Sequence, residues 1–276
     1  MRKPNYSPYI VPLQISICMS RIRKMLLYSL GEKRYLRLLA GSFQKLYKTG
    51  RLGVDYQDIY FLKNLIRPGD YCIDIGAHLG YFTFELGRLA GINGHVYAIE
   101  PMSKFFNTLK HMVSYRKLKN ITLYQNAMGA DTEFVEMGIP KLNNVKKYAY
   151  ARVKSTHNYL DYVESEQVKN VAGDQLFSNI KKLDFIKCDV EGLELPVFQS
   201  FLETVGKFRP VILCELEDPR KRETLLDLLS PYSYAIYYLE NKRLKPLSAD
   251  SAVDPVSHNH YFLPASRLES LAHIIS

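Results

Sequence analysis

The chain has 276 residues, of which 47% are hydrophobic and 24% charged, and its formal net charge is +9. This length allows one large domain, or one domain with an appendage, built around a full hydrophobic core. The composition excludes a disordered chain, and no sequence window reaches the roughly 20 apolar residues that a transmembrane helix needs.

The positive charge is concentrated at the N-terminus. Residues 1–51 contain eleven Lys or Arg and a single acid, Glu32, so the arm has a net charge of +10 and the rest of the chain is close to neutral. Pro12 and Gln14 interrupt the first apolar run, which argues against a signal peptide. We therefore divide the chain into a basic, largely helical N-terminal arm and a larger body, residues 52–276.

The arm contains an amphipathic pattern from about residue 34 to 48. It has three interpretations: a helix that packs on the body, an interfacial helix on an anionic membrane, and a contact with nucleic acid. The first is the plainest, and the second would place a cytoplasmic protein at the inner face of the membrane. The apolar face consists of Leu36, Leu39, Ala40, Phe43, Leu46 and Tyr47.

After the arm, short apolar runs alternate with helical patterns. This alternation is typical of a parallel sheet with helices on both faces. No clear helix separates the last two strands, so we expect an antiparallel edge there. Strands are predicted at 71–75, 95–99, 121–124, 184–188, 210–216, 233–239 and 259–263. Helices are predicted at 56–66, 79–90, 103–116, 193–204, 219–229 and 265–274.

Two further features describe the body. Cys72, Cys188 and Cys214 lie inside strand-like runs, where reduced cysteine behaves as a small hydrophobe, and this favours a reducing cytoplasm. Residues 132–170 break the alternation with a polar, Tyr-rich segment that is long for a loop. We expect this segment to form short strands and loops over the carboxyl edge of the sheet.

The segment GDYCIDIGAHLGYFT, residues 69–83, suggests a binding site. Asp74 ends the first strand, Gly76 permits a tight turn, and Gly80 allows the next helix to approach a ligand closely. The helix begins with free N–H groups that suit an anionic group. The next strand ends in Glu100, an acid placed to accept both hydroxyls of a ribose.

The pattern in this loop is D-x-G-x-x-x-G, which differs from the dinucleotide fingerprint G-x-G-x-x-G. An acid at the head of the loop would repel a pyrophosphate and attract an amino group. A ligand with an ammonium, a carboxylate and a ribose is S-adenosylmethionine. The structural alternative is a plain glycine turn between a strand and a helix.

Five segments carry a family resemblance: GDYCIDIGAHLGYFT (69–83), VYAIEP (96–101), QNAMGA (125–130), LDFIKCDVEGLELPVFQS (183–200) and RPVILCELE (209–217). Their order is similar to that in the FkbM-type methyltransferases, which are class I S-adenosylmethionine enzymes. The resemblance covers roughly residues 55 to 265. It implies an α/β, Rossmann-like methyltransferase fold whose seven-stranded, mostly parallel sheet has an antiparallel last strand, and O-methylation of sugar or natural-product hydroxyls.

The resemblance also implies a cofactor site. Glu100 matches the ribose acid, and Asn126 and Ala127 match the adenine edge after the third strand. His78 stands where Asn is more often expected, and residues 139–166 match no pattern, which leaves the acceptor open. The candidate set for S-adenosylmethionine is Asp74, Gly76, His78, Gly80, Thr83, Glu100, Pro101, Asn126, Ala127 and Asp189.

An alcohol is a poor nucleophile, so a positioned base or a metal ion would assist methyl transfer. Alternation along the fourth strand places Lys187 and Asp189 on one face, with Asp189 at the carboxyl edge. Asp189 is the first candidate for a base or metal ligand, Glu191 the second, and Lys187 would pair with one of these acids. The alternative for Asp189 and for Glu194 is capping of the following helix.

Asp189, Glu215 and His260 could together form a metal site, but scattered acids and one pair of histidines are not a metal-binding pattern, and we assign no metal. The predicted function is S-adenosylmethionine-dependent O-methylation of a sugar, a glycan or glycolipid, or a natural product. One alternative is an RNA methyltransferase that uses the basic arm, although no RNA-binding signature is present. The other is a module that binds S-adenosylmethionine without transferring methyl.

Overall fold

The computed structural model describes residues 13–53, 56–129, 132–142, 145–156, 160–247 and 258–276. The first twelve residues of the predicted arm lie outside the described residues. Within the described part of the chain, no helix is long and apolar enough to span a bilayer.

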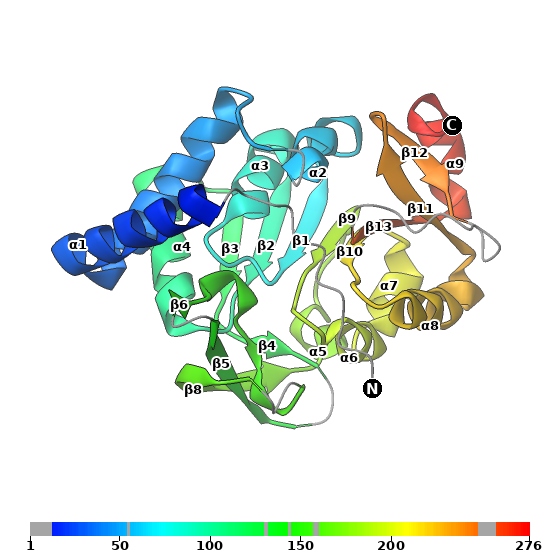
Figure 1. Cartoon of the computed structure of the whole chain (residues 1–276). Coiled ribbons are helices and arrows are strands. Elements are labelled where there is room, and N and C mark those ends of the chain that lie inside the picture. Colours follow the sequence, from blue (N-terminus) through cyan, green and yellow to red (C-terminus); the bar gives the residue numbers. More distant parts are fainter. Residues whose placement is uncertain (1–12, 54–55, 130–131, 143–144, 157–159, 248–257) are drawn as a thin grey trace.

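An eight-stranded sheet forms the centre of the molecule (Figure 1). Its strands are β1 (Tyr71–Ile75), β2 (His95–Ile99), β3 (Ile121–Tyr124), β9 (Phe185–Cys188), β10 (Val211–Glu215), β11 (Tyr234–Glu240), β12 (Arg243–Pro246) and β13 (Asn259–Pro264). The order is β12-β11-β13-β10-β9-β1-β2-β3, and only β12 and β13 run against the others. The seven predicted strands are confirmed, and β12 adds an eighth.

The antiparallel edge differs in detail from the prediction. β13 does pair antiparallel with β11, but it lies between β10 and β11 and not at the edge. The edge is β12, which forms a hairpin with β11 through Asn241 and Lys242. Both turn residues have positive φ, 51° and 62°, as a type I′ turn requires.

Helices cover both faces of the sheet. One face carries α2 (Gln57–Phe61), α3 (Tyr81–Ala90), α4 (Ser103–Tyr115) and α9 (Ala265–Leu271), and the other carries α5 (Gly173–Leu176), α6 (Glu194–Gln199), α7 (Leu202–Phe208) and α8 (Pro219–Leu229). The helix predicted at 193–204 is divided at Ser200, beyond which Phe201 is fully buried in the core. The three cysteines are buried and free.

The arm is a long helix, α1 (Leu13–Lys48), with a kink at Gly31, where φ is 71°. After the kink, Leu36 and Ala40 are buried in a cluster with α3 and α4, and Phe43 is buried against Tyr81 of α3. The structure therefore uses most of the predicted apolar face for internal packing, although Leu46 is 43% exposed. Membrane contact and the division at residue 51 stay predictions.

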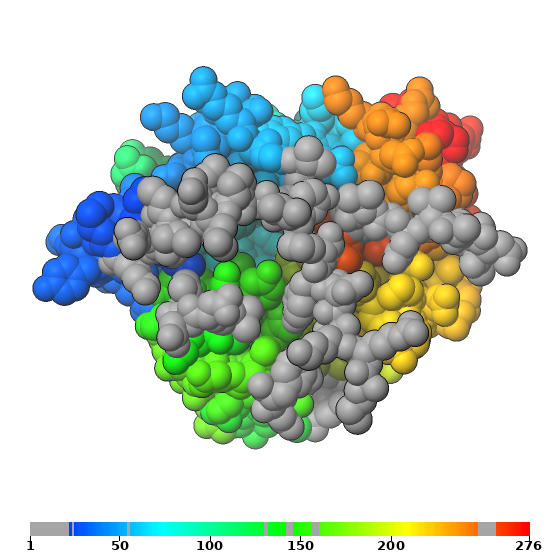
Figure 2. Space-filling model, in the orientation of Figure 1, coloured from blue at the N-terminus to red at the C-terminus, as the bar shows by residue number. Residues whose placement is uncertain are grey.

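A second sheet covers the carboxyl edge of the first. It consists of β4 (Ala127–Met128), β5 (Phe134–Leu142), β6 (Val145–Lys146), β7 (Arg152–Val153) and β8 (Tyr162–Val171). The predicted location is confirmed, but the expectation of short strands is wrong for β5 and β8, which form a long antiparallel pair. In β8 alternate residues face inward, a pattern that its polar composition hides. Figure 2 shows this sheet in green below the arm in blue.

Candidate active site

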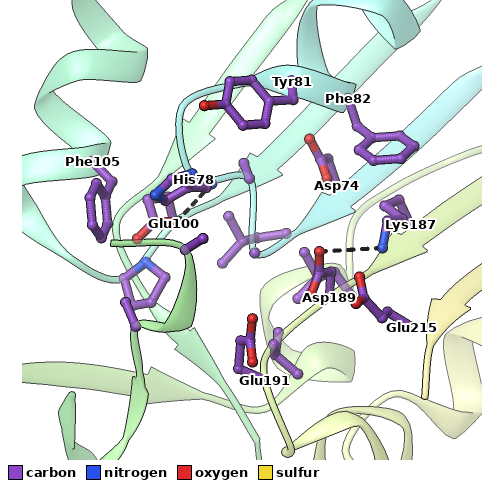
Figure 3. A pocket seen from close by; sticks show the side chains of 18 of the residues that line it. Asp74, His78, Tyr81, Phe82, Glu100, Phe105, Lys187, Asp189, Glu191 and Glu215 are labelled. Atoms are coloured by element: carbon purple, nitrogen blue, oxygen red, sulfur yellow. Dashed lines mark hydrogen bonds and ion pairs between the residues drawn. The ribbon is translucent and has the colours of Figure 1, made fainter. Parts of the chain in front are cut away.

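A cavity of about 480 Å³ lies where the carboxyl ends of the parallel strands meet the second sheet. Its size and position are those of a small-molecule site in an open α/β sheet. Figure 3 shows the His78 and Glu100 side chains on one side and Asp189, Glu191 and Glu215 on the other. The predicted site residues that line the cavity are Asp74, Gly76, His78, Glu100, Pro101, Asn126, Ala127, Lys187, Asp189, Glu191 and Glu215.

The turn after β1 depends on Gly76. Its φ is 82°, and a Cβ atom there would lie 1.9 Å from the carbonyl oxygen of Asp189. The turn is tied to the neighbouring strand, because the N–H groups of Gly76 and Ala77 donate to the carbonyl of Ile99 at 3.0 and 2.9 Å. The glycine is therefore needed because the end of β9 packs directly against the turn.

Two predicted cofactor residues lie outside the cavity lining. Gly80 begins α3 with φ 84°, and a Cβ there would lie 2.6 Å from Leu109 and Phe84, so its small size serves helix packing. Thr83 is buried, and its hydroxyl donates to Asp74 Oδ2 at 2.5 Å. Asp74 is itself 2% exposed, and burial raises its pKa to about 6. Thr83 therefore supports an acid of the cavity.

Glu100 lies at the end of β2 with both carboxylate oxygens directed at backbone amides. Oε2 accepts from the N–H of His78 at 2.8 Å, and Oε1 accepts from the N–H of Met102 at 2.9 Å. Each oxygen retains acceptor capacity for a further donor. Burial raises the pKa of Glu100 to about 8. The carboxylate is thus held in a fixed orientation on the cavity wall.

His78 has a positive φ of 48°, which turns its backbone N–H toward Glu100. Its ring packs against Phe105 at 4.3 Å between centroids. Nε2 is buried and has no hydrogen-bond partner among the described residues. Burial lowers the pKa of His78 to about 4, so the ring is neutral at physiological pH. A neutral imidazole with an unused nitrogen can still donate to or accept from a ligand.

The opposite side of the cavity is acidic. Asp189 Oδ2 lies 3.6 Å from Nζ of Lys187, which is fully buried. Burial acts to lower the pKa of Lys187, but the charges of Asp189 and Glu215 outweigh it and raise that pKa. Burial and the nearby Asp189 carboxylate raise the pKa of Glu215 to about 8. Two neighbouring carboxyl groups of this kind can hold one proton between them.

The other predicted acids have partners. Glu191, in a positive-φ conformation, forms an ion pair with Arg152 of β7. Burial raises the pKa of Glu191 to about 8 despite this ion pair. Glu194 accepts from the N–H of Gly192 at 2.7 Å and so stabilises the turn before α6. The N-cap of α6 is Leu193, and Asp189 makes no capping hydrogen bond to that helix. Neither acid shows a capping hydrogen bond to α6, because the bond of Glu194 goes to Gly192, which precedes the N-cap.

His260 does not join the cavity. Its Nδ1 lies 2.8 Å from the carbonyl of His258, and its Nε2 lies 3.3 Å from Nη1 of Arg222. Asp189 and Glu215 do lie together in the cavity lining, but without this histidine. In the part of the chain that the structure describes, no three His, Cys, Asp or Glu side chains are grouped to hold a metal ion.

The sequence did not reveal the aromatic residues that line the cavity, including one from the Tyr-rich segment 132–170. Phe82 lies beside Lys187, whose Nζ is 5.1 Å from the ring centroid, and Tyr81 stacks on Phe43 of the arm at 3.8 Å. Tyr148 comes from the segment that matched no pattern. The Tyr-rich composition of that segment was the available signal, but only the pairing of β5 with β8 and β7 brings it over the strand ends.

Comparison with known proteins identifies this arrangement. The model of the FkbM methyltransferase domain matches residues 74–241, which is more than half of the chain and includes the turn after β1, Glu100 and the segment around Asp189. The chain belongs to the FkbM methyltransferase family. It is an S-adenosylmethionine-dependent methyltransferase with the class I fold. A search of the curated proteins found no match.

Solved structures with a similar fold include several methyltransferases. The FkbM methyltransferase from Methylobacillus flagellatus is 17% identical, with a TM-score of 0.46, and the match covers 83% of this chain and 59% of that one. An O-methyltransferase from Thermotoga maritima is 14% identical, with a TM-score of 0.43 and coverage of 80% and 69%. Fibrillarin from Aeropyrum pernix with bound S-adenosylmethionine is 13% identical, with a TM-score of 0.41 and coverage of 75% and 73%.

Proposed function

We propose that this FkbM methyltransferase transfers a methyl group to a hydroxyl oxygen of a neutral, hydroxylated acceptor, such as a sugar, a glycan or glycolipid, or a natural product. The observation that carries the proposal is the pair of carboxyl groups, Asp189 and Glu215, on the opposite side of the cavity from Glu100. One side suits a nucleoside and the other suits removal of a proton from an alcohol.

The cofactor side fits S-adenosylmethionine. Glu100 would accept the ribose hydroxyls with the acceptor capacity that its two backbone hydrogen bonds leave. Nε2 of His78, buried without a partner among the described residues, is available for a polar atom of the ligand. Asn126 and Ala127 would lie beside the adenine, and the bare backbone at Gly76 beside the methionine moiety.

The proposed chemistry needs a base and a fixed geometry. When bound, S-adenosylmethionine supplies a methyl group whose bond to sulfur breaks, with the electron pair left on sulfur, as the acceptor oxygen bonds to the carbon. Asp189 would accept the proton that the acceptor hydroxyl loses, and Glu215 would share it. The Lys187 ammonium, 3.6 Å from Asp189 Oδ2, forms an ion pair that orients that carboxylate. Such a base contributes roughly 10²–10⁴-fold to rate.

The charges of the cavity favour a neutral acceptor. Its lining contains five carboxyl groups and a single lysine among the described residues: Asp74, Glu100, Asp189, Glu191, Glu215 and Lys187. The one lysine of the described lining, Lys187, is already paired with Asp189, so the lining offers no unpaired lysine to a phosphate group, which argues against RNA as the acceptor. Tyr148 and Tyr150 line the same space, and the ring of Tyr150, which is 38% exposed, offers an apolar surface to a sugar ring.

The proposal is tested with purified full-length protein and S-adenosylmethionine labelled in the methyl group. Neutral glycosides, amino sugars, sugar phosphates, catechols and RNA are offered in parallel. We expect label in a neutral hydroxylated acceptor, as an ether that survives alkaline treatment. Label in RNA would contradict the proposal. Cofactor binding with no S-adenosylhomocysteine formed from any acceptor would favour the non-catalytic alternative.

A further inference from the structure

The only acid of residues 1–51 lies next to the kink in α1. Glu32 directly follows Gly31, where φ of 71° breaks the helix, and precedes the stretch that packs on the body. Its side chain is 36% exposed, so most of it is covered by other residues. It reaches the second sheet, which is more than 100 residues away in the sequence.

The partner of Glu32 there is Tyr148, a wall residue of the cavity. The Tyr148 hydroxyl donates to Glu32 Oε1 at 2.6 Å. Tyr148 is 5% exposed, and four side chains pack on its ring: the guanidinium of Arg23 at 5.0 Å from the ring centroid, Nζ of Lys104 at 5.8 Å, the edge of Phe105 at 6.1 Å, and Tyr35 at 6.5 Å. Two of these neighbours, like Glu32, belong to the arm.

Ion pairs connect Glu32 to α4 and to the second sheet as well. Lys104 of α4 lies 3.0 Å from Glu32 Oε2, and Lys146 of β6 lies 3.6 Å from Oε1. Both lysines also form ion pairs with Glu164 of β8. Arg23 donates to the backbone carbonyl of Lys146 at 2.7 Å. The arm, α4 and the second sheet are thus joined around the segment that leads into Tyr148.

The segment that begins at Tyr148 forms one wall of the cavity. Tyr148–Tyr150 is a short 3₁₀ turn, followed by β7, and residues of both line the cavity. Tyr148 packs on Phe105, which in turn contacts His78, so the segment begins beside the cofactor side and runs toward the acidic side. The far end of the segment is held by the ion pair of Arg152 with Glu191. The near end is held by the arm. Because the segment from Tyr148 to Val153 is held at both ends, its position relative to Asp189 is fixed.

We propose that Glu32 is a positioning residue of the methyl-acceptor site: through the Tyr148 hydroxyl it fixes the wall against which the acceptor lies. The N-terminal arm is then part of the acceptor site and not an appendage to it. This inference rests on the proposed function for the identity of the site, because the wall is assigned to the acceptor only if Glu100 and the turn after β1 hold the cofactor.

The test compares Glu32→Ala, Glu32→Gln and Tyr148→Phe in the full chain. Alanine removes every interaction of Glu32, glutamine keeps an acceptor for the Tyr148 hydroxyl, and phenylalanine keeps the ring while removing the donor. The matched control is Glu136→Ala, which breaks an exposed ion pair with Lys154 on the same second sheet without touching the cavity.

The first readout is amide hydrogen exchange, which needs no acceptor. In Glu32→Ala we expect exchange to become about tenfold faster for the amides of residues 147–151 and unchanged for β1 and β2, because only the local restraint is lost. In Glu32→Gln the exchange of the same amides should become faster by less than in Glu32→Ala. Exchange in this segment as slow as in the Glu136→Ala control would overturn the inference, whether or not the protein transfers methyl groups.

The second readout uses an acceptor found in the labelling assay. Glu32→Ala and Tyr148→Phe should each raise the acceptor KM about tenfold, with kcat and S-adenosylhomocysteine affinity within about threefold, and the double variant should add little because the residues share one interaction. A loss of S-adenosylhomocysteine affinity equal to the change in KM would contradict the assignment to the acceptor side. Absence of methyl transfer would reject the proposed function and leave the exchange result to decide this inference.

Discussion

The two sides of the cavity are built in different ways. The proposed cofactor side comes mainly from one continuous stretch, residues 74–101, in which a turn and two strand ends place Asp74, Gly76 and Glu100, and Asn126 and Ala127 join it after β3. The proposed acceptor side brings together residues from four distant parts of the chain: Glu32, the segment with Tyr148 and Arg152, Asp189, and Glu215. The first is fixed by local backbone hydrogen bonds, and the second by ion pairs between elements.

This difference suggests a division of labour. A site whose shape comes from one turn changes little when other parts of the protein change, which suits a cofactor common to a whole family. A site assembled from an inserted sheet and an N-terminal arm can change with either of them, which suits an acceptor that differs between members. Three experiments test whether the two sides are separable.

The largest expected effect separates catalysis from cofactor binding. Asp189→Asn should lower turnover by roughly 10²–10⁴-fold while S-adenosylhomocysteine affinity changes less than about threefold, because it removes the proposed base but no ribose contact. Glu100→Gln should do the reverse and weaken affinity by about 10- to 100-fold, since a charge-assisted hydrogen bond is lost. Calorimetry measures the affinity for S-adenosylhomocysteine, and steady-state kinetics measure turnover. If both variants reduce the same quantity, the two sides are not separable.

A smaller effect tests the point where the two sides meet. Gly76→Ala should lower the free energy of unfolding by about 3 kcal/mol or more, because the new Cβ would lie 1.9 Å from the Asp189 carbonyl oxygen. Gly69→Ala is the matched control: its φ is also positive, 91°, but nothing lies within 4 Å of its Cβ. Urea denaturation of both variants isolates the clash from backbone strain. Equal losses would show that the turn does not press on β9.

The smallest effect is a pH dependence of binding. Because burial raises the pKa of Glu100 to about 8, its carboxyl group is mostly protonated below that pH in the free protein. Hydroxyl donors favour the ionised form, so S-adenosylhomocysteine affinity should rise about tenfold from pH 7 to 8.5. The rise should vanish in Glu100→Gln and persist in Glu215→Gln. A rise lost only in the second variant would place the titrating group on the acceptor side.

The same difference explains what the sequence could predict. The seven strands and the cofactor-side residues follow from short-range signals: β-branched runs, a glycine turn and an acid at each strand end. Gly80 and Thr83 were assigned to the ligand because spacing alone does not distinguish helix packing from ligand contact. The pairing of Glu32 with Tyr148 depends on a helix kink and a strand register, which no local pattern encodes.

The most direct measurement is a crystal structure with S-adenosylhomocysteine bound. The account predicts that both ribose hydroxyls donate to Glu100 and that the sulfur faces Asp189 across a space bounded by Tyr148. A nucleoside bound away from Glu100, or a sulfur atom directed away from Asp189, would contradict it.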